Sequence, residues 1–154
     1  MKLSISNKIL SFILFFLVSS FSVVNAKGRE IIVHQCMVDA SNRYSIPLRA
    51  LVAVWLTEGG KIGTVSKNTN NTVDHGPMQI NTIWANKLQK EFGITKDMIT
   101  NDFCSNIMSA AYILRYEINA ANGNFWDGVG HYHSHTAIHK YPYIRKVYNN
   151  SLTF

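Results

Sequence analysis

Apolar residues recur at intervals of three and four along most of the chain, and no stretch of six residues alternates cleanly as a half-buried strand would. The clearest case follows Pro47, where apolar side chains take the spacing of one buried helix face: Leu48, Leu51, Val52, Trp55 and Leu56. Gly59 and Gly60 are expected to end this helix. The pattern predicts a mostly α domain.

Further segments carry the same helical period or helix-end signals. They are a helix within residues 31–44, one capped by Asn81 that passes Trp84 and Leu88 and ends near Gly93, the longest from Asn101 or Asp102 to before Gly123, a shorter helix or turn over residues 125–132, and a last one opened by Pro142. Residues 61–75 are rich in Asn, Thr, Lys and Gly, which predicts a solvent-facing loop.

The first 26 residues have the layout of a secretory signal. Lys2 and Lys8 precede an apolar run over residues 9–18, and Ala26 supplies a small residue at the expected cleavage point. This run is about half of the roughly 20 residues that a membrane-spanning helix needs. We expect residues 1–26 to be removed, leaving a single domain, residues 27–154, in the periplasm or cell envelope with no stable membrane span. An uncleaved anchor is the alternative.

Charge and cysteine content narrow the classes of partner. The chain has 15 Lys and Arg against 9 Asp and Glu, and without Lys2 and Lys8 the net charge is +4. Because no run of four basic residues occurs, we expect no nucleic-acid partner. In an exported chain, Cys36 and Cys104 favour one disulfide over a metal pair, with two buried thiols as the alternative.

Glu58 is the strongest candidate for chemistry. It is expected at the C-terminal end of the helix that follows Pro47, where the helix dipole disfavours a negative charge. Apolar neighbours such as Trp55 disfavour the ionised form further, so the pKa of this carboxyl should lie above its usual value. A carboxylic acid that stays protonated near neutral pH can donate a proton to a glycosidic oxygen. A solvated glutamate at a helix end is the alternative.

A second motif, Gly-Pro-Met-Gln-Ile-Asn, occupies residues 76–81. Gly76 permits a close backbone approach, and Gln79 offers both a donor and an acceptor to sugar hydroxyls and acetamides. Together with Glu58-Gly59-Gly60, the motif resembles the catalytic segment of the lytic transglycosylases, especially the small specialised ones that accompany secretion, conjugation and pilus machines. Further matches around Cys104-Ser105-Asn106-Ile107 and over residues 125–132 and 143–148 extend the resemblance to most of residues 36–148.

The resemblance implies a lysozyme-like α fold and cleavage of the β-1,4 bond between N-acetylmuramic acid and N-acetylglucosamine. Glu58 would protonate the leaving oxygen and then take the proton of the muramyl 6-hydroxyl, so that a 1,6-anhydro end forms. Tyr132 would orient Glu58 by a hydroxyl hydrogen bond. The implied substrate-binding residues are Gly76, Met78, Gln79, Asn81 and His133. No cofactor is implied. The expected partners are peptidoglycan strands and a secretion, conjugation or pilus machine.

Three departures from the family pattern keep two alternatives open. Gly59 stands where a serine usually follows the glutamate, Pro77 replaces a leucine, and His131-Tyr132-His133-Ser134 replaces Ala-Tyr-Asn-Ala. We interpret these as altered tuning of an active enzyme. The alternatives are a hydrolytic muramidase with Asp74 as a second carboxylate, although Asp74 is expected to be a loop or capping residue, and a non-catalytic peptidoglycan-binding protein of a secretion apparatus.

Histidines and tryptophans raise two further questions. His131, His135 and His139 are spaced to share one face of a helix, but no Cys, Asp or Glu lies close to them in the sequence. We therefore expect histidines at the edge of the cleft and on the surface, and no metal site. Trp55 and Trp84 are predicted to be core residues.

Overall fold

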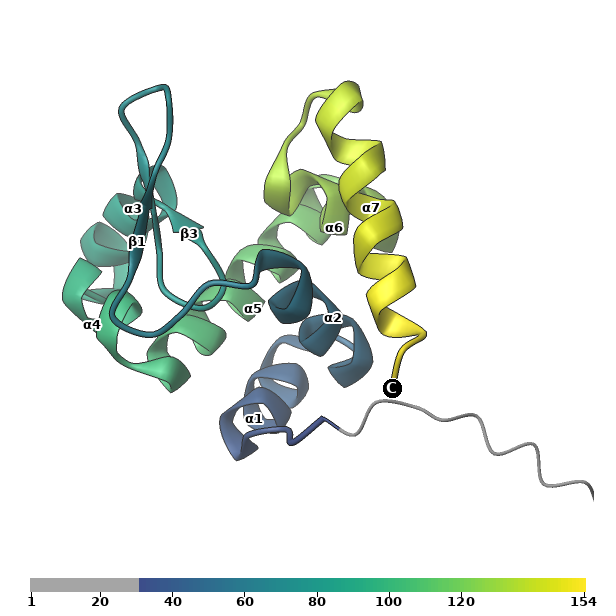
Figure 1. The fold of residues 1–154 in the computed structure, drawn as a ribbon, viewed down its shortest axis with the longest axis horizontal. Helices are drawn as coiled ribbons and strands as arrows, with labels where there is room; N and C mark the ends of the chain where they lie inside the picture. Colours follow the sequence, from purple (N-terminus) through teal and green to yellow (C-terminus); the bar gives the residue numbers. More distant parts are fainter. Residues whose placement is uncertain (1–30) are drawn as a thin grey trace, which may run out of the picture.

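The computed structural model describes residues 31–154, so the predicted signal segment lies outside the described residues. In this part of the chain there are seven helices and, at one side of the molecule, a small three-stranded antiparallel sheet in the order β1-β2-β3 (Figure 1). The elements are α1 (Gln35–Tyr44), α2 (Leu48–Glu58), β1 (Val65–Lys67), β2 (Val73–His75), β3 (Ile80–Asn81), α3 (Thr82–Phe92), α4 (Lys96–Asn101), α5 (Phe103–Ala120), α6 (Phe125–His133) and α7 (Ala137–Ser151). The predicted mostly α fold is confirmed.

Helix α5 runs through the middle of the molecule (Figure 1). It contacts α1, α4 and α6, while α2 packs against α7. The strands, α3 and α4 lie on one side of α5, and α2, α6 and α7 lie on the other (Figure 1). The core follows this arrangement, with its largest fully buried side chains drawn from both sides: Met37, Leu51, Met78, Ile80, Leu88, Ile99, Ile107, Ile113, Leu114, Val52, Val54 and Val129.

Two predicted helix starts are confirmed by their capping bonds. The Asn81 side chain accepts a hydrogen bond from the Ile83 amide at 3.0 Å, and Asp102 accepts one from the Ser105 amide at 2.6 Å. Each bond satisfies an amide that has no partner within its own helix. The longest helix therefore starts and ends where the sequence places it.

The structure corrects three expectations about secondary structure. Residues 61–75 include the β1–β2 hairpin, with Val65 opposite His75, and not only a loop. Strands of two or three residues are too short for an alternating pattern to be visible in the sequence. The short helix α4 was missed. Pro142 lies inside α7 and does not open it. The carbonyl that Pro142 leaves without a helical donor belongs to Ile138, which is 75% exposed and can be solvated.

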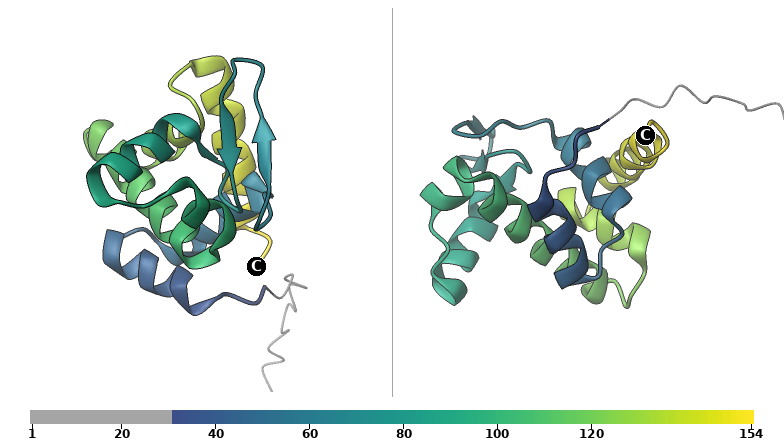
Figure 2. Two further views of the ribbon diagram at one scale, coloured as in Figure 1. Left: turned by 90° about the vertical axis from the view of Figure 1, so that its left-hand side faces the viewer. Right: turned by 90° about the horizontal axis from the view of Figure 1, so that it is seen from below.

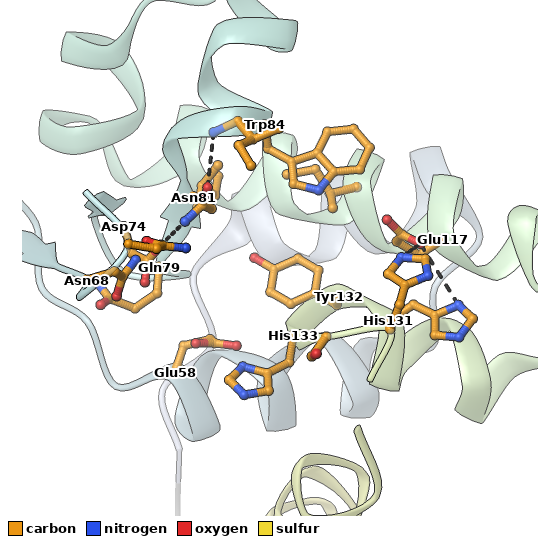
Figure 3. Close-up of a pocket in the computed structure, with 16 residues that line it drawn as sticks. Glu58, Asn68, Asp74, Gln79, Asn81, Trp84, Glu117, His131, Tyr132 and His133 are labelled. Atoms are coloured by element: carbon orange, nitrogen blue, oxygen red, sulfur yellow. Dashed lines mark hydrogen bonds and ion pairs between the residues drawn. The ribbon is translucent and has the colours of Figure 1, made fainter. Parts of the chain in front are cut away.

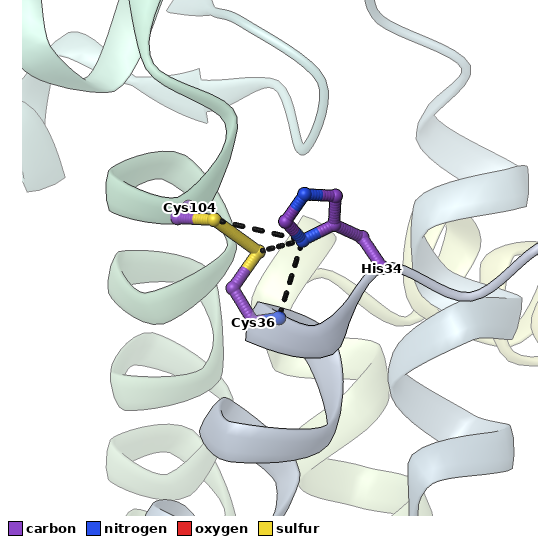
Figure 4. A group of neighbouring side chains, drawn as sticks. All are labelled: His34, Cys36 and Cys104. Atoms are coloured by element: carbon purple, nitrogen blue, oxygen red, sulfur yellow. Dashed lines mark hydrogen bonds between the residues drawn. A yellow bond between two sulfur atoms is a disulfide. The ribbon is translucent and has the colours of Figure 1, made fainter.

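The predicted disulfide is present and joins α1 to α5 (Figure 4). The Cα atoms of Cys36 and Cys104 lie 5.5 Å apart. His34 caps α1 by accepting a hydrogen bond from the Cys36 amide at 3.2 Å, and its ring lies beside both sulfurs. Because both cysteines are bonded to each other, this group offers no thiolate to a metal.

Candidate active site

A cleft of about 500 Å³ separates the β1–β2 hairpin from the end of α6. The hairpin tip and the α6–α7 turn extend to the same end of the molecule (Figures 1 and 2). Most of the residues that line this cleft have polar side chains. The lining includes Glu58, Asn68, Asn70, Asp74, Gln79, Asn81, Trp84, Glu117, His131, Tyr132, His133, Ser134 and His135. The predicted candidates Glu58, Gln79, Asn81, Tyr132 and His133 are thus brought together on one surface (Figure 3).

Glu58 is the last residue of α2, and its carboxyl faces the cleft (Figure 3). Burial is the largest cause of a rise in its pKa from 4.5 to about 7, since desolvation penalises the charged form. The negative charge of Asp74 raises the pKa further, whereas the Tyr143 hydrogen bond and the positive charge of Lys146 lower it. The predicted upward shift is confirmed, and Glu58 can both hold and release a proton near neutral pH.

The hydroxyl that bonds Glu58 belongs to Tyr143 on α7, not to Tyr132. Tyr143 donates to Oε1 of Glu58 at 2.5 Å. Tyr132 instead donates to the backbone carbonyl of Met78 at 2.8 Å. The predicted Tyr132–Glu58 hydrogen bond is therefore wrong, because Tyr132 is directed at the backbone of the 76–81 segment while α7 packs against α2 and brings Tyr143 to the carboxyl.

The two glycine positions have steric reasons. Gly59 ends α2 in the left-handed region, with φ of 63°. A Cβ on Gly60 would collide with the carbonyl oxygen of Gly76 and with Gln79. Only a residue without a side chain lets the segment after α2 lie this close to the Gly76–Gln79 turn. The Gly59-Gly60 pair thus ends the helix and places the turn beside Glu58.

Asn106 on α5 holds the turn over residues 76–79 in place by hydrogen bonds. It is fully buried on α5, and its side-chain amide donates to the carbonyls of His75 at 3.0 Å and Ile99 at 2.7 Å. Its side-chain oxygen accepts from the Met78 amide at 2.8 Å. A Cβ on Gly76 would strike this amide and the Ile99 carbonyl. Asn106 therefore ties three segments together under the floor of the cleft.

The candidates of the 76–81 motif divide into buried and cleft-lining residues. Gly76 and Met78 are buried and do not line the cleft. Gln79 lines the cleft, and its amide nitrogen donates to the Gly76 carbonyl at 2.8 Å, while its side-chain oxygen has no hydrogen bond within residues 31–154. Asn81 also lines the cleft, but its amide nitrogen bonds Asp74 and its oxygen caps α3. Of the polar side chains in this motif, Gln79 thus keeps the most hydrogen-bonding capacity for a ligand.

Asp74 differs from its expected position, whereas Trp84 packs against the core as predicted and also lines the cleft. Asp74 lies in β2 and lines the cleft, so it is neither a loop nor a capping residue. Its carboxylate accepts a hydrogen bond from Asn81 at 2.8 Å. Trp84 is half-buried on α3. Its ring and that of Tyr116 pack in a T-shaped arrangement, with 5.1 Å between their centroids. An aromatic face in a polar cleft can pack against the apolar face of a sugar ring.

His133 lies at the junction of the cleft and a second pocket formed by α7. Its ring stacks on the Tyr143 ring, with 4.6 Å between centroids and 4° between planes. Partial burial lowers the pKa of His133, and the nearby His139 and Lys146 lower it further. A neutral imidazole beside Glu58 can both donate and accept hydrogen bonds, as the missing family asparagine would.

The structure also assembles a group that the sequence could not show. Glu117 of α5 meets His131 and His135 at the end of the cleft remote from Glu58 (Figure 3). No Asp or Glu lies near these histidines in the sequence, but the fold brings the Glu117 carboxylate beside His131 and His135. His139 lies on α7, outside this group.

Sequence reasoning assigns no functional role to Tyr143, Asn106 or Glu117, and it predicts Trp84 only as a core residue. Tyr143 and Asn106 stand inside segments that carried the family resemblance, but their neighbours there gave them no distinct role. Glu117 and Trp84 sit in helices whose apolar period explains the residues around them. Only the packing of α3, α5 and α7 around the cleft distinguishes them.

Comparison with known proteins agrees with the resemblance. The family model described as the transglycosylase SLT domain matches residues 35–149. The chain is 28% identical over 120 residues to the invasion protein IagB of Salmonella typhimurium and to that of Salmonella typhi, which covers 75% of this chain and 74% of theirs. Among the helices that the structure describes, none has the length and apolar character needed to cross a bilayer. The family match includes every residue that lines the cleft. The chain therefore belongs to the transglycosylase SLT domain family and has its lysozyme-like fold.

Proposed function

We propose that this protein is a peptidoglycan lytic transglycosylase in which Glu58 is the single acid and base. The observation that carries the proposal is the state of Glu58, which ends a helix inside a polar cleft with a pKa of about 7. A general acid is most effective when its pKa lies near the working pH. Family membership supports the substrate class, a glycan strand of peptidoglycan.

The reaction proceeds in two proton transfers. Protonated Glu58 donates its proton to the oxygen of the β-1,4 bond, and the bond between that oxygen and the anomeric carbon of N-acetylmuramic acid breaks. The resulting carboxylate takes the proton of the muramyl 6-hydroxyl, whose oxygen bonds to the anomeric carbon. The products are a free N-acetylglucosamine 4-hydroxyl and a 1,6-anhydromuramyl end, and Glu58 is protonated again. No water is consumed.

The remaining cleft residues have supporting roles. Tyr143 orients the Glu58 carboxyl through their hydrogen bond. Gln79 and His133 bind hydroxyl and acetamide groups from opposite walls, and Trp84 packs against a sugar face. Tyr132 holds the Met78 carbonyl and so sets the position of the Gln79 turn. Gly76, Met78 and Asn81 act by shaping and fixing that turn and the start of α3.

Hydrolysis is a second candidate, and Asp74 is the observation that favours it. Its carboxylate lines the same cleft as Glu58, and its charge raises the pKa of Glu58. Glycosidases that use water or a covalent intermediate need such a second carboxylate. The Asn81 hydrogen bond leaves Asp74 one further oxygen for this purpose. A non-catalytic binding protein would have no use for the buried acid.

The setting we propose is the cell envelope. The signal layout of residues 1–26 supports export, and the similarity to proteins named invasion proteins supports a role in invasion. We propose that this role is to open the wall locally for a trans-envelope machine. The disulfide between Cys36 and Cys104 supports an oxidising compartment.

Mass spectrometry of the material released from purified sacculi tests the reaction. Wild-type protein should release muropeptides one water lighter than the reducing-end form, and Glu58→Gln should lower their rate by at least about a hundredfold. Asp74→Asn is the matched variant, and it should keep the anhydro product. Reducing ends that disappear in both variants would establish the hydrolase, and no release by the wild-type protein would contradict both enzymatic proposals for the isolated chain.

A further inference from the structure

Two histidines and a glutamate converge at the end of the cleft remote from Glu58 (Figure 3). Glu117 projects from α5, His131 from α6, and His135 from the turn that leads to α7. This group has no part in the proposed glycan chemistry. Nothing in the helical period of α5 requires a carboxylate at this buried position.

The distances within the group are close to those of a metal site. Nε2 of His135 lies 3.1 Å from Oε2 of Glu117, and Nδ1 of His131 lies 4.0 Å from the same oxygen. All three candidate ligand atoms lie within 4.8 Å of one another. Ligand atoms in a tetrahedral zinc site stand roughly 3.3 Å apart, as bonds of about 2.0 Å require.

At least one of the two histidine rings would have to turn to bind a metal ion, and the His135 ring has room to do so. The two rings are stacked, with 4.2 Å between centroids and 11° between planes. Two stacked rings do not direct their nitrogen lone pairs at one point, so rotation about the Cβ–Cγ bonds is needed. The His135 side chain is 66% exposed and can turn freely, and its exposure also provides a path for an ion.

Burial explains why a cation would be favoured. The Glu117 side chain is only 7% exposed, and its Oε2 lies 3.1 Å from Nε2 of His135 without making a hydrogen bond within residues 31–154. Nδ1 of His131 is also buried and has no hydrogen-bond partner in this part of the chain. A buried polar atom without a partner costs about 1–3 kcal/mol, and more when it is charged. A cation placed between these two atoms would satisfy both at once.

We propose that Glu117, His131 and His135 form a binding site for a divalent transition-metal ion of the zinc type. Two imidazoles and one carboxylate favour Zn²⁺, Ni²⁺ or Cu²⁺ over Mg²⁺ and Ca²⁺, which prefer oxygen ligands alone. The fourth position faces the cleft and is filled by water. The bound ion joins α5 to the α6–α7 turn and so holds the wall of the cleft beside Tyr132 and His133.

Zinc titration of the full chain, purified without a polyhistidine tag and treated with a chelator, tests this site. We expect one Zn²⁺ per chain and no competition from Mg²⁺. Co²⁺ added to the metal-free protein should give the visible absorption of a tetrahedral complex, and Zn²⁺ should then displace it and remove that absorption. His135→Asn should weaken Zn²⁺ affinity at least about tenfold. Because His135→Asn also removes the 3.1 Å contact with Glu117, the affinities are compared at a temperature at which the metal-free variant and the metal-free wild type are both folded.

Two further variants separate the site from general histidine binding. Glu117→Gln keeps the shape of the side chain and should weaken binding as much as His135→Asn. His139→Asn removes an exposed histidine outside the group and should leave binding unchanged. Equal Zn²⁺ affinity of wild type and His135→Asn, or equal weakening by His139→Asn, would overturn the proposal and leave an ordinary buried ion pair.

Discussion

The pKa of Glu58 lies near neutral pH because α2 ends at the wall of the cleft, where the surrounding protein partly desolvates its carboxyl. The single hydrogen bond from Tyr143 only partly replaces the lost water. The balance leaves the pKa at about 7, so the acid required for bond cleavage is protonated below that pH. The pKa of Glu58 therefore depends on whether the Tyr143 hydroxyl is present.

The pH dependence of glycan cleavage should therefore separate the two tyrosines. In the wild type, kcat/KM should fall as pH rises above about 7, when Glu58 becomes a carboxylate. Tyr143→Phe removes a donor that favours the charged form, so the pKa of Glu58 rises and the alkaline limb should move to higher pH. Tyr132→Phe should leave the limb in place, because its hydroxyl bonds the Met78 carbonyl. A shift with Tyr132→Phe alone would contradict the observed geometry.

Protein stability should carry the same signature of Glu58. A carboxyl whose pKa is raised on folding binds more protons in the folded state, so the free energy of unfolding falls as pH rises from 4.5 to about 7. Glu58→Gln removes this penalty and keeps an acceptor for Tyr143. At pH 8 it should be more stable than wild type by up to about 3 kcal/mol, and at pH 4 the two should be alike. Parallel denaturation profiles across this range would contradict the burial of the charge.

At the scale of elements, the cleft depends on how α5 holds a short irregular segment. The turn over residues 76–79 has no helix or long strand to fix it, and Gln79 itself takes a positive φ of 48°. Asn106 supplies the missing bonds from α5, to the carbonyls of His75 and Ile99 and to the Met78 amide. A single buried side chain thus stands in for regular backbone pairing.

Asn106→Ala should accordingly destabilise the protein by about 3 kcal/mol or more, since it leaves three buried backbone groups without partners. Urea denaturation monitored by circular dichroism measures this loss. Asn119→Ala on the same helix is the matched control, because Asn119 is exposed, and it should change stability by less than about 0.5 kcal/mol. Equal effects from both substitutions would contradict the role of Asn106 as a clamp.

At the scale of the whole molecule, one covalent bond joins the start of the described chain to its central helix. The disulfide closes a loop of 68 residues that contains α2, the sheet, α3 and α4, and so most of one wall of the cleft. Such a crosslink stabilises the fold chiefly by restricting the unfolded chain. The Arg49 guanidinium bonds the carbonyls of Ser151 and Phe154, which fastens the other end of the chain to α2.

Removing the disulfide should lower the free energy of unfolding by about 4 kcal/mol, the value expected for a loop of this length. The double variant Cys36→Ala with Cys104→Ala should unfold at a lower urea concentration than oxidised wild type. Reduced wild type should match the double variant, because His34 caps α1 without help from the disulfide. Identical urea midpoints for the oxidised and reduced protein would contradict this expectation.

Local signals along the chain are sufficient to predict the helical framework, because they act over a few residues. Asn81 and Asp102 cap their helices, apolar spacing sets the buried faces, and two glycines end α2 at an acid. The family resemblance added the pairing of Glu58 with the 76–81 motif. These features need no knowledge of which helices meet.

Only the tertiary structure decided which side chains meet across the cleft. Tyr143 reaches Glu58 because α7 packs on α2, and Glu117 reaches His131 because α6 packs on α5. Such contacts join residues far apart in sequence, so no local period or capping signal encodes them. The short strands are stabilised by pairing with one another, and α7, which contains Pro142, is stabilised by packing against α2 and α6. Neither depends on the propensity of the residues themselves.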